Sequence, residues 1–147
     1  MEKITKQLGG LLIETEKLVL EMDKESIEYK VSSNKWSKKE ILGHLIDSAI
    51  NNLQRFTEVQ FMPKPYVIRK YAQSDLVVAN KYQDKEISSL LQLWISLNQQ
   101  ILFVISNLDR DMLDLKIDVD HNNSKTLKWL IEDYVIHMKH HLNQIKN

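Results

Sequence analysis

Apolar residues recur at three- and four-residue spacing along four long segments of the chain, residues 2–29, 37–60, 84–108 and 124–146. This spacing gives each helix one apolar stripe, which must be buried against a neighbouring element. Only three Gly and two Pro occur in 147 residues, so little interrupts these segments. The pattern predicts an all-α protein, a four-helix bundle formed by a single domain over residues 1–147.

The second segment has the clearest helix start. Ser37 is followed three residues later by Glu40, which is the pattern of a capping box. Beside the apolar stripe of this helix, a helical wheel at about 100° per residue places a line of polar residues. These are His44, Ser48, Asn51 and Arg55. Because a buried polar group without a partner costs roughly 1–3 kcal/mol, this line must meet water in a cavity or other polar groups.

Residues 61–84 form a long link between the second and third helices, and Pro63 and Pro65 end the helix before it. A link of this length predicts a crossover, or a segment that covers a site. It would make the second and third helices parallel, with a short helix at residues 74–82. Farther along, apolar and polar residues alternate within residues 107–124, which predicts a short extended piece or a hairpin arm.

Two histidines, His137 and His141, lie four residues apart in the last segment and therefore share one helix face. Imidazoles at this spacing can hold a divalent metal ion from two corners. Asp133, one turn before His137, could accept a hydrogen bond from the far ring nitrogen of that histidine. His140 points farther out and is a bystander. The alternative is a set of half-exposed polar side chains near a helix terminus.

Composition limits the classes of function. Twenty basic and twenty acidic residues give a net charge of zero, which disfavours a nucleic-acid partner. The absence of Cys excludes disulfides, thiolate nucleophiles and Cys-ligated metal sites, and it suits a reducing compartment. The N-terminus has no apolar stretch typical of a secretion signal, and the longest apolar run, Ile101–Ile105, is too short to span a membrane. We expect a cytoplasmic protein without a membrane partner.

The histidines of the second and fourth helices predict a shared site. If His44 faces His137 and His141 across the bundle, three neutral imidazoles can bind zinc or nickel and leave one position open. An open position is more typical of a catalytic site than of a structural one. On the residues alone, unrelated histidines remain the alternative.

Two stretches of the sequence resemble the DinB/YfiT-like superfamily. The first, residues 36–48, carries Trp-Ser-x-x-Glu-x-x-x-His, is followed by Arg55-Phe56, and is similar to the second helix of that superfamily. The second, residues 127–145, carries His-x-x-x-His and is similar to the closing helix of the superfamily. The similarity covers nearly the whole chain in helix order and in the long second connection. It implies a four-helix bundle, often a homodimer, with a divalent metal ion on three histidines that correspond to His44, His137 and His141.

Characterised members include bacillithiol and mycothiol S-transferases and a mycothiol-dependent maleylpyruvate isomerase. The resemblance therefore implies a metal-dependent enzyme that activates a thiol or water for transfer or hydrolysis, acting on a small molecule. A low-molecular-weight thiol would supply the sulfur that this chain lacks.

Three residues are catalytic candidates. Ser48 lies near the predicted ligand face, Asp47 is expected to turn outward, and Arg55 would either orient an anionic substrate or pair with a carboxylate. Asn51 would contact substrate or form a polar bond in the core. Two other functions remain open: a non-catalytic bundle that binds a metal or ligand, and a helical interaction module with incidental histidines.

Overall fold

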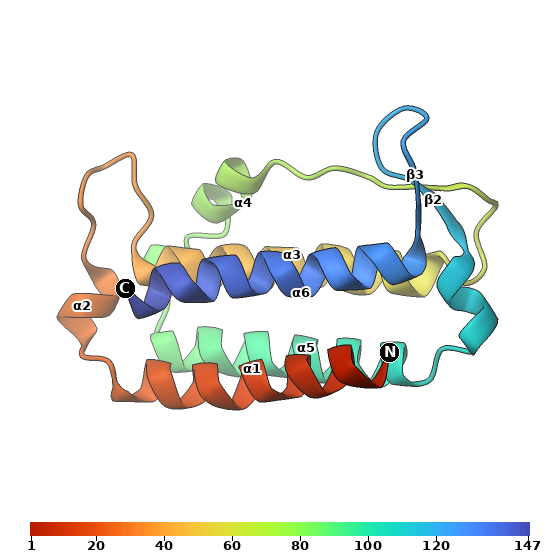
Figure 1. Ribbon diagram of the computed structural model, residues 1–147. Coiled ribbons are helices and arrows are strands. Elements are labelled where there is room, and N and C mark those ends of the chain that lie inside the picture. The colour runs from red at the N-terminus through yellow and green to blue at the C-terminus, as the bar shows by residue number, and fades with distance from the viewer.

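The computed structural model describes residues 1–147, and its four long helices form the predicted bundle (Figure 1). In chain order they are α1 (Glu2–Glu21), α3 (Lys38–Glu58), α5 (Ile87–Ser106) and α6 (Leu127–Lys146). Helices α3 and α6 form one layer and α1 and α5 the other, and each helix packs on both helices adjacent to it. Helices α3 and α5 run in the same direction, which confirms the predicted crossover (Figure 1).

The interior of the bundle is one hydrophobic cluster of 28 buried residues, to which all four long helices contribute. Trp94 of α5 and Phe56 of α3 are its largest fully buried side chains. Fully burying a large apolar side chain stabilises a fold by about 1.5–3 kcal/mol. The apolar stripes read from the sequence therefore supply the main driving force for the bundle.

The first predicted helix is divided in two. Helix α1 ends at Glu21, and a separate helix α2 (Lys24–Glu28) follows. The helical path ends at Met22, whose backbone is already extended, and Asp23 then starts α2, because its carboxylate accepts a hydrogen bond of 2.8 Å from the backbone N–H of Ser26. Asp is a preferred N-cap residue. The prediction of one continuous helix over residues 2–29 was wrong at this point.

The capping box at the start of α3 is confirmed. The Ser37 hydroxyl accepts a hydrogen bond of 3.1 Å from the backbone N–H of Glu40, and the Glu40 carboxylate accepts one of 2.9 Å from the backbone N–H of Ser37. Every residue of α3 from Lys39 to Ala49 is buried, the polar ones included. Such burial arises because α5, α6 and the crossover surround this half of the helix.

The crossover between α3 and α5 contains β1 (Tyr66–Val67), helix α4 (Gln73–Ala79) and a 3₁₀ turn η1 (Tyr82–Asp84), and it runs back along the outer side of α3 (Figure 1). A Cβ atom on Gly43 would lie only 2.2 Å from the ring of Tyr82. Glycine at position 43 thus allows η1 to approach the backbone of α3 closely.

A small sheet joins the crossover to the chain between α5 and α6. After the 3₁₀ turn η2 (Arg110–Asp114), strands β2 (Lys116–Asp118) and β3 (Ser124–Thr126) form an antiparallel hairpin. Strand β1 adds to it in parallel, with Tyr66 opposite Ile117. The hairpin agrees with the predicted extended piece, whereas the pairing with β1 was not predicted because the two segments are distant in sequence.

By length and composition alone, α5 would also pass as a membrane-spanning helix, with a mean hydropathy of 1.2 over its most apolar 18 residues. A core helix of a helical bundle meets the same criterion, so this observation does not distinguish the two.

Candidate metal centre

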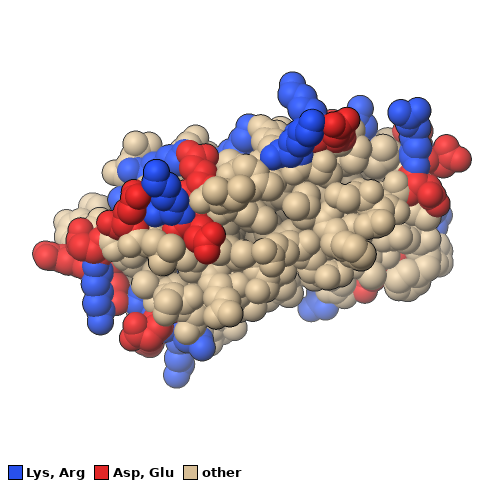
Figure 2. All heavy atoms as spheres, turned by 90° about the horizontal axis from the view of Figure 1, so that it is seen from below, with Lys and Arg blue, Asp and Glu red and all other residues tan.

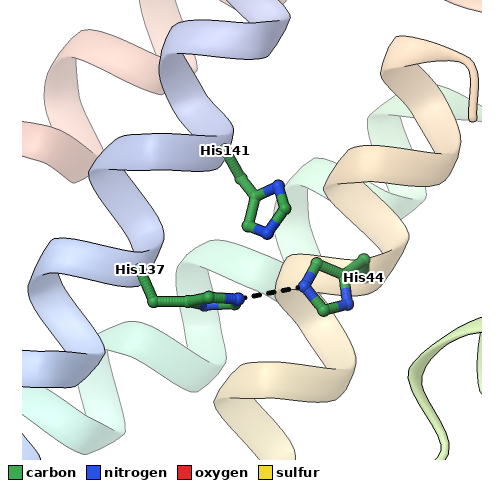
Figure 3. Close-up of side chains that lie close together, drawn as sticks. All are labelled: His44, His137 and His141. Carbon is green, nitrogen blue, oxygen red and sulfur yellow. Dashed lines mark hydrogen bonds between the residues drawn. The ribbon is translucent and has the colours of Figure 1, made fainter.

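Three histidines from two helices meet between α3 and α6 (Figure 3). His44 comes from α3, and His137 and His141 come from adjacent turns of α6, where the helical period aligns them. Their nitrogen atoms lie within 4.8 Å of one another, and no Asp or Glu side chain joins the group. The structure thus brings together the three residues that the sequence singled out and leaves no fourth protein ligand among them.

Hydrogen bonds on the far side of two rings determine which nitrogen faces the centre. Nδ1 of His141 lies 2.8 Å from the Gln144 side-chain oxygen. Because that oxygen can only accept, Nδ1 carries the proton and Nε2 keeps its lone pair. Nδ1 of His137 lies 3.5 Å from the Ser48 hydroxyl, a longer contact that also leaves Nε2 facing inward.

His44 is supported differently. Its side chain is completely buried, and the Trp36 ring packs beside it with the ring centroids 4.9 Å apart. Its Nδ1 is buried without a hydrogen-bond partner. Packing against Trp36 and the contact of its Nε2 with Nε2 of His137 therefore orient this imidazole.

The environment keeps the histidines neutral. Burial, reinforced by the other two imidazoles, lowers the pKa of His44 to about 4. Burial, together with the neighbouring His141 and His140, likewise lowers the pKa of His137 to about 4. At neutral pH both rings therefore offer a lone pair, as a metal ligand must.

The distances fit a divalent metal ion. Nε2 of His44 and Nε2 of His137 lie 3.2 Å apart. Two nitrogen ligands of a tetrahedral zinc ion, each bonded at about 2.0–2.1 Å, would lie roughly 3.3–3.4 Å apart. At this distance the two nitrogens either share a hydrogen bond, as drawn in Figure 3, or both offer lone pairs to a cation that lies between them. The three imidazoles can therefore hold a metal ion.

Comparison with known proteins agrees with this fold. The sequence model described as the DinB superfamily matches residues 12–145. The chain belongs to the DinB superfamily. No curated protein matches it significantly.

Two solved structures resemble this DinB-superfamily chain. One is YfiT from Bacillus subtilis, described as a probable metal-dependent hydrolase with an unusual four-helix bundle topology. It is 20% identical in sequence, with a TM-score of 0.87, and the match covers 99% of this chain and 83% of the YfiT chain. The other is the DinB-like protein YjoA from Bacillus subtilis, which is 18% identical with a TM-score of 0.66; the match covers 97% of this chain and 87% of the YjoA chain. At these identities the likeness establishes the fold.

The predicted support of His137 by Asp133 is not observed in the DinB chain. Asp133 forms no hydrogen bond to His137, whose Nδ1 faces Ser48 on the neighbouring helix instead. Asp133 is exposed and lies with Arg55 at the wall of an adjacent cavity. The prediction considered α6 alone, whereas the partner of His137 comes from α3.

The prediction that Asp47 turns outward was wrong. Its side chain is 2% exposed and accepts hydrogen bonds of 2.6 Å from the Tyr82 hydroxyl and 3.0 Å from the Asn80 amide. Burial raises the pKa of Asp47, and these two hydrogen bonds oppose that change. The outward face of α3 is covered by the crossover, so Asp47 holds η1 in place and does not reach the three histidines.

Of the two alternatives predicted for Arg55, pairing with a carboxylate is not observed. Its guanidinium donates to the side-chain oxygen of Asn52 at 3.3 Å and to the carbonyl of Arg69 at 2.7 Å. It also lies over the ring of Tyr71, 5.5 Å from the centroid. Asn51, the other polar residue of this line, donates to the carbonyl of Asp47 within its own helix.

One cavity is lined by His137, and a separate cleft is lined by residues that contact the other two histidines. The first is a cavity of about 260 Å³, here called the His137 cavity, lined by Ser48, Arg55, Tyr71, Asp133 and His137 among others. The second hollow is a more open cleft of about 670 Å³, here called the Trp36 cleft, whose wall includes Trp36 and Gln144 but none of the three histidines. The sequence motifs contain Trp36 and Gln144, but nothing in their spacing showed that they flank the histidines.

Proposed function

We propose that this protein is a divalent-metal-dependent hydrolase of small molecules, with the ion held by His44, His137 and His141. One observation carries the proposal: three imidazole ligands converge within 4.8 Å, with no fourth protein ligand among them, and one of them lines a cavity of molecular size. Zinc and nickel suit an all-imidazole set best. The description of YfiT as a probable metal-dependent hydrolase supports the same reaction class.

The protein residues prepare the site in three ways. Burial keeps His44 and His137 unprotonated. Gln144 fixes the tautomer of His141 through its side-chain oxygen. The His137 cavity admits substrate at the ring of His137. When bound, the metal supplies a Lewis acid that lowers the pKa of a water molecule toward neutrality.

Transfer of a low-molecular-weight thiol is the second candidate. The His137 cavity reaches the site, and the larger Trp36 cleft has room for a cosubstrate beside Trp36 and Gln144, the neighbours of His44 and His141. The chain has no Cys, so a thiol nucleophile would have to come from such a molecule. Either reaction would suit the cytoplasmic location expected from the sequence.

Metal analysis of the untagged protein tests the ligand set. We expect close to one ion of zinc or nickel per chain in the wild type and a nearly complete loss in His44→Ala, because only two ligands then remain. His140→Ala is the matched control, since His140 is an exposed neighbour outside the group of three. Metal retained by His44→Ala, or lost equally in both variants, would refute the assignment.

Turnover separates catalysis from a structural role. A panel of small esters, amides and thiol acceptors is assayed with metal-loaded, chelated and reloaded protein. Hydrolysis that disappears with chelation and returns with zinc supports the hydrolase, whereas thiol-dependent consumption of an electrophile supports the transferase. A chelator that lowers the melting temperature while no substrate turns over under any loading supports a non-catalytic bundle.

A further inference from the structure

The His137 cavity is polar and carries an unusual charge arrangement. Three charged residues line it: Arg55, Lys70 and Asp133. The Lys70 ammonium already pairs with Asp120 at 3.2 Å on the surface. Arg55 has no carboxylate within salt-bridge distance. The cavity therefore presents, beside the candidate metal centre, a guanidinium without a salt bridge, although the Asp133 carboxylate is near enough to interact with its charge.

Arg55 is held in position to bind a ligand. It is half-buried, and its two hydrogen bonds go to neutral oxygens, the Asn52 amide and the Arg69 carbonyl. The Tyr71 ring packs against the guanidinium at 5.5 Å. A guanidinium has more N–H donors than these two acceptors use. A partly desolvated guanidinium with free donors is suited to a planar anion that accepts two parallel hydrogen bonds.

We propose that Arg55 binds a carboxylate of the substrate within the His137 cavity, which places the rest of that substrate beside His137. The reaction at that position rests on the proposed function, but the binding does not, because Arg55 is not a metal ligand. The volume of about 260 Å³ suits a small acid or the carboxylate-bearing end of a larger molecule.

Asp133 narrows the choice of anion. Its carboxylate lines the same cavity as Arg55 and adds a negative charge that opposes a second anionic group. A ligand with a single carboxylate carries one negative charge, whereas a phosphate dianion carries two and is therefore repelled more strongly by Asp133. Asp133 therefore disfavours a dianion more than a monoanion in this cavity.

Titration of the metal-free protein with N-acetylglycine tests the proposal, with neutral N-acetylglycinamide as the matched ligand. Calorimetry should show that the acid binds at least about tenfold more tightly than the amide, given the strength of charge-assisted hydrogen bonds. Arg55→Met should abolish this preference, and Arg55→Lys should reduce it severalfold because it keeps the charge without the bidentate geometry. Arg110→Met removes an exposed arginine of η2 and should leave the preference unchanged.

Three results would overturn the proposal: no preference for the acid in the wild type, wild-type preference in both Arg55 variants, or the same loss in Arg110→Met. Circular dichroism and metal content, both expected to be unchanged, verify that the variants fold. In Asp133→Asn, inorganic phosphate should gain more affinity than N-acetylglycine does; an equal change would refute the discrimination by Asp133 against a dianion.

Enzyme assays distinguish the two proposals. Metal-dependent turnover that is equally fast for neutral and carboxylate substrates would refute the role of Arg55 and leave the proposed hydrolase intact. Binding of N-acetylglycine through Arg55, without metal-dependent turnover of any substrate, would refute the hydrolase and leave the carboxylate site intact.

Discussion

Each imidazole of the metal centre is prepared by a different neighbour. Gln144 fixes the tautomer of His141, Ser48 faces the outer nitrogen of His137, and the Trp36 ring packs beside His44. The buried Nδ1 of His44 has no hydrogen-bond partner, which is costly in a folded protein. An unsatisfied group of this kind is typical of a residue retained for function rather than for stability.

The burial of His44 predicts a pH-dependent stability of the metal-free protein. The pKa of this residue is lowered from 6.5 to about 4 by burial, so between these values the unfolded state binds more protons. The free energy of unfolding should therefore fall as the pH drops from neutrality toward 4, with His44 alone contributing about 1–2 kcal/mol at pH near 5. Urea denaturation at several pH values measures the slope.

His44→Gln is the control for this effect, because it replaces the titrating ring with a neutral polar side chain. Its stability should depend less steeply on pH across the same window. Parallel profiles for the variant and the wild type would contradict the assignment of the slope to His44.

At the scale of elements, the crossover is fastened to α3 by one close approach and one buried hydrogen-bond group. The Tyr82 ring lies over Gly43, and its hydroxyl donates to Asp47, one turn later on α3. Strand β1 fastens the other end of the crossover by pairing with β2. Segment 61–84 thus covers α3, as the length of the link predicted, and Tyr71 within it forms part of the His137 cavity.

Gly43→Ala should loosen this attachment. The new Cβ would lie 2.2 Å from the Tyr82 ring, so the ring must move and its hydrogen bond to Asp47 is strained. We expect a loss of about 1–3 kcal/mol in the free energy of unfolding, the usual cost of overpacking. Gly10→Ala is the control: nothing lies within 4 Å of its Cβ, so better helix propensity should stabilise the protein by about 0.5–1 kcal/mol. Equal effects of the two substitutions on urea denaturation would contradict the role of Gly43.

At the scale of the whole molecule, α5 gives the layer of α1 and α5 a surface without charge, whereas α1 carries Lys and Glu residues. Helix α5 contains no Lys, Arg, Asp or Glu over 20 residues. Figure 2, seen from below onto this layer, shows a broad uncharged area, with the charged side chains gathered mainly around its edges. The exposed apolar side chains of the two helices include Phe103 at 66% and Ile13 at 73%. Depletion of charge together with exposed aromatic residues is characteristic of protein interfaces.

We propose that two copies of the chain associate through this layer, as the family resemblance led us to expect. Light scattering after size-exclusion chromatography should give the mass of a dimer for the wild type. Phe103→Glu should yield a monomer because it would place a charge inside the interface. Val78→Glu, at an exposed position of α4 on the opposite side, is the control and should remain dimeric. A monomeric wild type would refute the interface.

The sequence by itself determined the bundle and paired His137 with His141, whereas the meeting of His44 with them was an expectation from the family resemblance. Apolar stripes with a helical period require burial. The i, i+4 spacing of His137 and His141 places both on one helix face, and the capping box of Ser37 and Glu40 likewise involves only residues close in sequence. These features depend on neighbours in sequence, so a helical wheel reveals them. The length of segment 61–84 also indicated a crossover, because a short loop cannot join two parallel helices.

Only the tertiary structure decided which polar groups meet. Asp47 is outward on the wheel of α3 yet buried, because a crossover residue 35 positions later in the chain, Tyr82, covers it. Ser48 rather than Asp133 faces His137, and Arg55 remains without a carboxylate partner. Such contacts join residues far apart in the chain, and their geometry follows from how the helices and the crossover pack together, which the period of a single helix does not specify.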